Sequence, residues 1–161
     1  MSRCRKKHSN DTEQVPLEVE IPATSLTATS SSQYLWPLSR FHPSNVLSSS
    51  DYSWNSGTYA PASIVIDLGN PPVCITRIAL LTEMLPAIGK VSHQIRLGTT
   101  SDTAHSVYWH NGVTFHGEWT HFHLTETGGM QRKSRFVEII THKSPSWVAW
   151  RRIRVWKAVE Q

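Results

Sequence analysis

The sequence predicts an all-β protein, an antiparallel β-sandwich or jelly roll, from three observations. Short runs alternate between apolar and polar side chains, which is the period of a strand with one buried face. Gly, Pro, Asn and Asp separate these runs at short intervals. No window carries apolar residues at the i, i+3, i+4, i+7 spacing of an amphipathic helix. Many short strands with frequent turns are typical of a sandwich or jelly roll.

The clearest strand is the run from residue 64 to residue 69, and we expect it to organise the core. It follows a tryptophan-bearing turn at residues 54–57. Residues 69–72, Gly-Asn-Pro-Pro, end it, because Gly opens φ and Pro lacks the N–H that a β-ladder needs. The apolar residues at alternate positions would share one face of the strand: Ile64, Ile66 and Leu68.

Further runs with the same alternation are interpreted as strands. An edge strand is expected at 17–21, and in the last run Ile153 and Val155 would point inward while Trp156 faces out. Asn111-Gly112 is interpreted as a turn that ends one of them. The remaining runs are 74–81, 91–97, 107–110, 118–124, 136–141 and 152–156.

Length and charge suit one domain with a tail. The chain has 161 residues, of which 17% are charged, with seven Trp and nine His, a globular composition. We expect residues 1–16 to be a flexible tail and residues 17–161 to form the domain. The formal net charge is only +4, a mild excess rather than the dense basic stripe of a dedicated nucleic-acid binder. Late basic residues form two clusters: Arg132, Lys133 and Arg135, then Arg151, Arg152, Arg154 and Lys157.

Cysteine content and the N-terminus bear on the cellular compartment. Two cysteines, Cys4 and Cys74, are too few for a disulfide framework, which favours a reducing compartment. The basic start at residues 1–7 is not followed by the apolar stretch of a secretory signal. No apolar run approaches the roughly 20 residues of a membrane span. We therefore expect an intracellular protein, cytoplasmic or nuclear.

Several segments stand in a characteristic order: Ala28-Thr29-Ser30-Ser31, Asn45-Val46-Leu47, Ser53-Trp54, Ile64–Gly69, Ile75–Ile78, Arg135–Ile139 and Arg152–Val155. In this order the chain resembles the discoidin family, the coagulation-factor (F5/8) type C domain among the galactose-binding-like β-sandwiches. Ile64–Gly69 is similar to the family's V-D-L-G strand, and Arg135–Ile139 to its R-Y-V-R-I strand. The resemblance covers roughly residues 24–156.

This resemblance implies an eight-stranded jelly roll without catalytic machinery that binds ligands through loops at one end. Relatives bind sugars, phospholipid head groups, proteins or nicked DNA, so the fold does not settle the ligand. Secreted members often tie their ends with a disulfide, and no cysteine lies near this C-terminus. Sugar-binding members often hold calcium through an Asp in the 45–54 loop and a Glu in the last strand. Here Asp51 is present but Arg152 replaces the Glu, so we expect no calcium and no cofactor.

The family's binding loops correspond to residues 34–42, 51–59 and 83–90, which carry many large apolar groups. An aromatic face can stack on a sugar or receive a peptide side chain, and Arg, His and Lys add directional donors. Packing at the end of the barrel is the alternative for each residue. Trp36 is the strongest candidate because Pro37 would turn it outward. The candidate ligand-binding residues are Tyr34, Trp36, Arg40, His42, Tyr52, Met84, Ile88, Lys90 and Trp147.

Residues 144–150 carry Trp147 and Trp150 between the last two strands. One interpretation is a lid on the core in which both indoles lie under Arg151 as a cation–π contact. The other is contact with a partner, and the sequence leaves both open.

Histidines raise the question of a metal. His121 and His123 alternate on one strand face and could bind a metal together, which loosely resembles the first motif of the cupins. The spacing to Gly117 and Glu126 does not fit that motif, and its second half is missing. We therefore expect no metal site, and a cupin-like metalloenzyme stays the weak alternative. No nucleophile elbow, P-loop or Rossmann fingerprint is present.

Together these observations predict a non-enzymatic recognition module that binds a glycan or a protein partner. Such a module could also serve as a scaffold subunit of a larger assembly. Two alternatives use the same fold. A nicked-DNA binder would use the late basic clusters and would weaken steeply with salt. A phospholipid binder would dock through Trp36, Leu85 and Ile88.

Overall fold

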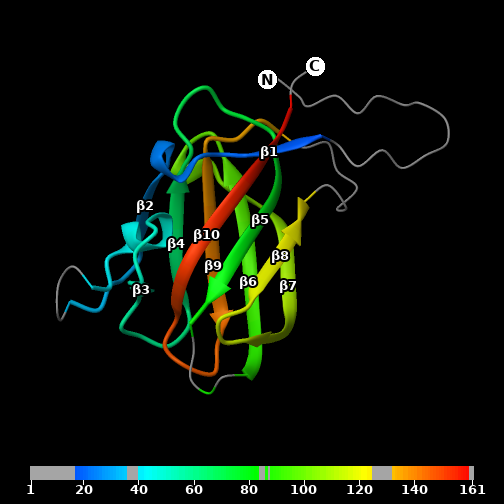
Figure 1. Ribbon diagram of the computed structural model, residues 1–161. Coiled ribbons are helices and arrows are strands. Elements are labelled where there is room, and N and C mark those ends of the chain that lie inside the picture. The colour runs from blue at the N-terminus through cyan, green and yellow to red at the C-terminus, as the bar shows by residue number, and fades with distance from the viewer. Residues whose placement is uncertain (1–16, 36–39, 84–85, 87, 125–131, 160–161) are drawn as a thin grey trace.

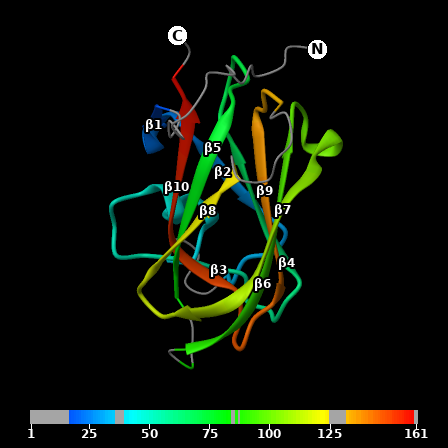
Figure 2. The ribbon, with the colours of Figure 1, turned by 90° about the vertical axis from the view of Figure 1, so that its right-hand side faces the viewer.

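The structure is a computed structural model (Figure 1) that describes residues 17–35, 40–83, 86, 88–124 and 132–159. These residues form two five-stranded antiparallel sheets and no α-helix. The two sheets face each other as layers, which Figure 2 shows from the side. The predicted all-β sandwich is therefore confirmed. The predicted tail, residues 1–16, lies outside the described residues.

The order of strands across each sheet is not the order along the chain. The first sheet has the order β1 (Glu18–Glu20), β10 (Ala149–Ala158), β5 (Ile75–Thr82), β8 (Trp119–His123), with β3 (Trp54–Asn55) also paired to β10. The second has the order β2 (Thr27–Ser30), β4 (Ala62–Asp67), β9 (Phe136–Lys143), β6 (Ile88–Gly98), β7 (His105–Phe115). Three short 3₁₀ turns are η1 (Ala23–Ser25), η2 (Pro43–Leu47) and η3 (Ser101–Thr103).

The core lies between the layers and follows the predicted alternation. In β4, Ile64 and Ile66 have no exposed surface, whereas the residues between them are partly exposed. From the other sheet, Trp54 and Trp150 meet edge to face with ring centroids 5.0 Å apart. Trp54 is fully buried, and its Nε1 donates to the carbonyl of Ser32 at 3.0 Å. The core therefore reaches the end of the sandwich that β3 closes.

Two local predictions are wrong. Asn111-Gly112 is not a turn but lies within β7, opposite Ser92 and Val91 of β6. The long β6 supplies a continuous ladder there, and that pairing outweighs the local turn preference of Asn-Gly. Trp156 does not face solvent but is only 9% exposed, because the guanidinium of Arg77 covers its ring at 3.8 Å.

The two ends of the sandwich differ in what they carry. Strand β1 and the last residues of β10 lie at one end, which is uppermost in Figure 1. At the other end, β5 stops at Thr82, β7 turns into β8 after Phe115, and β9 passes into β10 through residues 144–148. We call this end, opposite the one that carries β1, the loop end.

Cys74, just before β5, is buried and disulfide-bonded. The sequence predicts no disulfide framework, because Cys4 and Cys74 are only two cysteines; Cys4 lies outside the described residues. Among the described residues, no helix has the length and apolar character needed to cross a bilayer.

Candidate binding groove

An open groove of about 540 Å³ lies at the loop end. Its volume falls within the range of about 300–1,000 Å³ that is usual for small-ligand sites. Segments far apart in sequence contribute its walls, from the residues just before η2 to the turn before β10. The residues that line it are Arg40, Phe41, Asp51, Tyr52, Ser53, Asn55, Glu83, His116, Ser146, Trp147 and Ala149.

Backbone hydrogen bonds through β3 hold these segments together. The Tyr34 N–H donates to the carbonyl of Asn55 at 2.8 Å, and the Asn55 N–H donates to the carbonyl of Phe41 at 3.3 Å. The Ser56 N–H donates to the carbonyl of Val148 at 2.9 Å. Two points of the connection between β2 and β3, and the segment before β10, are thus tied to one short strand or the residue after it, so the groove is built by the fold itself.

Gly57 is required at the turn after β3. Its φ is +69°, in the left-handed region that L side chains rarely adopt. A Cβ added there would also lie 3.2 Å from the Cα of Tyr34. The Gly57 N–H donates to Oδ1 of Asn55 at 2.9 Å, which fixes the side chain of a groove residue.

Aromatic side chains gather at the groove. Tyr34 lies with its ring centroid 5.4 Å from that of Phe41 and 5.5 Å from that of Trp147. Trp147 is 40% exposed and Tyr52 is 50% exposed. These exposures contrast with Trp54 and Trp150, which are buried beneath the same end. The groove therefore offers aromatic surface to a ligand.

Polar groups of both signs stand beside these rings. The guanidinium of Arg40 lies 5.9 Å from the Phe41 ring centroid. Glu83 pairs with Arg151 at 3.2 Å, and both side chains are about one third exposed. With Asp51 and Asn55 the groove holds hydrogen-bond donors and acceptors together, as a ligand rich in hydroxyls requires.

The 45–53 loop, which carries Tyr52 into the groove, is closed around Arg152. Its guanidinium donates to the carbonyl oxygens of Asn45 and Tyr52, each at 3.3 Å, and to that of Ser50. The resemblance implied calcium in this region for sugar-binding members. The residues here do not fit calcium, because a donor-only cation already occupies the carbonyl oxygens.

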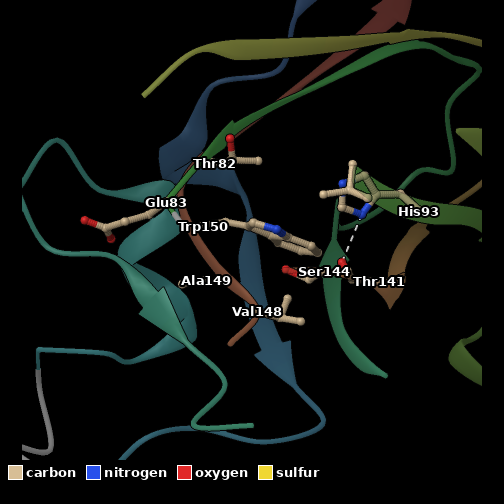
Figure 3. Close-up of a pocket in the computed structure, with 9 residues that line it drawn as sticks. Thr82, Glu83, His93, Thr141, Ser144, Val148, Ala149 and Trp150 are labelled. Carbon is tan, nitrogen blue, oxygen red and sulfur yellow. Dashed lines mark hydrogen bonds between the residues drawn. The ribbon is translucent and has the colours of Figure 1, made fainter. Parts of the chain in front are cut away.

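A second, much smaller cavity lies deeper, with a volume of about 10 Å³ (Figure 3). It lies beside His93, whose Nδ1 is 3.0 Å from Oγ1 of Thr141, and beside the Trp150 indole. Burial, with the nearby His110 and His142, lowers the pKa of His93 to about 3. Such a volume is the size of one water molecule, so this cavity cannot hold a sugar, and the groove is the candidate site.

The predicted site residues fall into three groups. Arg40, Tyr52 and Trp147 line the groove, and Tyr34 packs against Trp147. His42 instead caps η2, where its Nδ1 accepts from the Ser44 N–H at 3.1 Å. Ile88 and Lys90 are exposed residues of β6 and are not among the described residues that line the groove. Trp36 and Met84 lie outside the described residues.

Six polar groove residues are not among the predicted ligand-binding residues: Asp51, Ser53, Asn55, Glu83, His116 and Ser146. His116 was missed because β7 was expected to stop at residue 110, whereas it runs to Phe115 and so carries the next turn to the loop end. The alternation His110, Gly112, Thr114 against Asn111, Val113, Phe115 is the signal that could have extended the strand. The other five lie within segments 51–59, 83–90 and 144–150, which the sequence indicates as candidate loops.

The lid of two indoles under Arg151 is wrong. Trp150 points into the core against Trp54, and Arg151 pairs with Glu83. Trp147 stays at the surface beside Tyr34. Neighbouring positions on this segment thus serve the core and the groove separately.

The strand histidines His121 and His123 do stand side by side on β8, with ring centroids 6.3 Å apart. Nδ1 of His121 lies 3.3 Å from a guanidinium nitrogen of Arg77. Burial and the Arg77 charge lower the pKa of His121. Within the described residues no group of three His, Cys, Asp or Glu side chains could hold a metal.

Several arginines are paired with carboxylates of the same chain at the partly exposed surface. Arg135 bonds Asp67 through two nitrogens, both at 2.8 Å. Arg154 lies 3.4 Å from Glu20. These pairs engage members of both late basic clusters that the nicked-DNA alternative would use, so less positive charge is left for phosphates.

The architecture has close structural relatives. The fold is that of family 32 carbohydrate-binding modules. The module of Clostridium perfringens NanJ, in complex with galactose, superposes with a TM-score of 0.70 at 13% identity, over 88% of this chain and 100% of that one. A second C. perfringens module, from GH89 and in complex with GalNAc-β-1,3-galactose, gives 0.72 at 12% identity, over 85% and 99%.

The C-terminal domain of a chitobiase from Bacteroides fragilis gives a TM-score of 0.68 at 15% identity, over 88% of this chain and 100% of that domain. No protein-family model matches the sequence, and no curated protein does. At these identities the likeness is one of fold. The predicted galactose-binding-like sandwich is confirmed, and membership of the discoidin family stays a prediction.

Proposed function

We propose that this protein is a non-enzymatic recognition module that binds a glycan in the groove at the loop end. The observation that carries the proposal is the groove itself. It combines exposed rings, Tyr52 and Trp147, with donors and acceptors of both signs on a rigid sandwich. Preorganised loops of this kind bind without losing much conformational freedom.

The chemistry of the groove suits a sugar. A pyranose has apolar C–H faces that stack on aromatic rings and hydroxyl groups that both donate and accept. Arg40 and Asn55 can donate to such hydroxyls, and Asp51 and Glu83 can accept from them. The solved complexes of two structural relatives with galactose and with GalNAc-β-1,3-galactose add support, because those modules share this fold.

The decisive experiment is titration calorimetry with galactose and with GalNAc-β-1,3-galactose, after a glycan array has ranked other sugars. We expect Trp147→Ala to weaken binding at least about tenfold, as loss of a central aromatic contact does. Trp109→Ala is the matched control, since Trp109 is 52% exposed but lies on β7 and does not line the groove. Its affinity should equal that of the wild type.

Two results would overturn the proposal. One is the absence of binding to any arrayed glycan, and the other is equal loss in the two tryptophan variants. Capture of a protein in place of a glycan would favour the protein-partner alternative. Binding that falls steeply with salt would favour nucleic acid, because a sugar site releases no counterions.

The intracellular location, cytoplasmic or nuclear, also stays a proposal. The disulfide at Cys74 counts against it, since reducing compartments keep thiols free. Fractionation of cells that express the tagged protein, with and without reductant during lysis, would decide the point.

A further inference from the structure

The strongest unexplained feature outside the groove walls is the environment of Arg152. Its Nη1 donates to the carbonyl oxygens of Asn45 and Tyr52, both at 3.3 Å, and of Arg151 at 2.6 Å. Its Nη2 donates to the carbonyl oxygen of Ser50. Four backbone carbonyls, three of them from one loop, thus converge on a single positive group.

Such a set of oxygens is chemically a cation site. Backbone carbonyls supplemented by a carboxylate are the ligands that hard divalent cations take. Arg carries only donors and a permanent charge, so it can satisfy the same oxygens. Burial and the adjacent Arg151 lower the pKa of Arg152, whereas Asp51 on the same loop raises it. The hydrogen bonds to the loop carbonyls and the negative charge of Asp51 oppose these two effects, and a guanidinium stays charged in proteins.

We propose that Arg152 is a built-in cation that closes the 45–53 loop in place of a divalent metal. The loop carries Asp51, Tyr52 and Ser53 to the groove. The groove is then formed without any metal. This inference concerns the loop and does not depend on what the groove binds.

The loop has a second clamp that acts independently of charge. Nδ2 of Asn45 donates to the carbonyls of Arg40 at 2.9 Å and of Ser53 at 3.1 Å. The two ends of the loop are thus joined by an amide, and its middle is left to Arg152. Removing the guanidinium should therefore loosen the middle of the loop without unfolding the sandwich.

Thermal unfolding with millimolar CaCl2 or with EDTA tests the proposal. The wild-type midpoint should be the same in both buffers. Arg152→Met keeps much of the stem and removes the charge, and we expect its midpoint to fall by roughly 5–10 °C. Arg152→Lys should recover part of that loss. Arg154→Met is the matched control, because Arg154 lies two residues on in β10 with its side chain 53% exposed, and its midpoint should change little.

Arg152→Glu gives the sharpest result. This substitution removes the positive guanidinium and adds a second carboxylate beside Asp51. The carbonyl and carboxylate oxygens are then left without a cation. We expect its midpoint to be low in EDTA and to rise by several degrees in CaCl2, with one calcium bound per chain by calorimetry. Calcium binding by the wild type, an unchanged midpoint for Arg152→Met, or indifference of Arg152→Glu to CaCl2 would each overturn the inference. None of these readouts uses a glycan.

Discussion

The two ends of the sandwich use charged side chains in opposite ways. At the end that carries β1, charged side chains form ion pairs: Arg135 with Asp67, Arg77 with Glu18, and Arg96 with Glu138. At the loop end, Arg40 and Asp51 are exposed and line an open groove. One end thus uses its charged groups to join strands, whereas the loop end pairs some of them, such as Glu83 with Arg151, and presents others to solvent.

Aromatic residues divide along the same line. Trp156, which lies opposite Glu20 of β1, is covered by Arg77, whereas Tyr52 and Trp147 at the loop end are about half exposed. A single exposed aromatic side chain is ordinary. Several of them around one groove, beside exposed charged side chains, indicate a recognition surface. This difference indicates that the exposure of Tyr52 and Trp147 belongs to the loop end and does not reflect poor packing of the sandwich.

The largest effect is expected where the core passes beneath the groove. Trp54→Ala removes a fully buried indole that contacts Trp150 and bonds the Ser32 carbonyl. We expect a loss of about 3–5 kcal/mol in the free energy of unfolding, measured by urea denaturation followed by circular dichroism. Trp54→Phe should lose clearly less, because a ring remains. A loss below about 1 kcal/mol for Trp54→Ala would contradict the assignment of this residue to the core.

The next effect lies between the two ends, at His93. Its pKa is lowered to about 3 in the folded protein, mainly by burial and further by His110 and His142, against about 6.5 in the unfolded chain. The unfolded state therefore binds the extra proton between these values, and stability should fall as pH drops below about 6.5. One such group gives a slope of about 1.4 kcal/mol per pH unit.

His93→Gln, which does not titrate, should remove about one proton from this dependence. Urea denaturation from pH 7 to pH 4 measures it, since the slopes of the two proteins should differ there. Burial also lowers the pKa of His110, which acts in the same direction, so a residual slope is expected in the variant. Parallel curves for the wild type and the variant would contradict the burial of a neutral His93.

A smaller effect is expected at the charged end. Arg135, first by its hydrogen bonds, lowers the pKa of Asp67, so the carboxylate stabilises the fold above its ordinary pKa and this contribution is lost in acid. Asp67→Asn should lower the thermal midpoint by a few degrees at pH 7, because partly exposed pairs are weak. The difference from the wild type should shrink toward pH 3. Equal midpoints at pH 7 would show that the pair adds nothing measurable.

The fold was predictable because its strands show a two-residue alternation of buried and exposed side chains. Ile64 and Ile66 in β4, and Val91, His93, Ile95 and Leu97 in β6, alternate so regularly that each strand identifies its buried face. The buried His93 fits that face although a histidine carries no apolar signal. Where the prediction failed, at Asn111-Gly112, a neighbouring strand overrode the local turn chemistry, and a single strand read alone does not contain that information.

The site was predictable only in part, because a groove is a product of pairing. Arg40, Tyr52 and Trp147 stood in loops that the sequence could place at one end, and they line the groove. His116 joined them because β7 continues along β6 to Phe115, past the Asn111-Gly112 pair that the sequence interpretation took as a turn. Arg152 contacts carbonyl oxygens about 100 residues away in the chain, so the sequence shows that an arginine stands where the glutamate is expected, but not that its guanidinium reaches these oxygens.

The smallest effect on stability should come from the loop end itself. Tyr52 is 50% exposed and lines the groove, so Tyr52→Ser should change the free energy of unfolding by no more than about 0.5 kcal/mol. Under the proposed function it should nevertheless weaken glycan binding several-fold. Tyr59→Ser is the matched control, because Tyr59 is 64% exposed and is not among the described residues that line the groove. If Tyr52→Ser cost stability and spared binding, the loop end would be packed for the fold, and the contrast between the two ends would disappear.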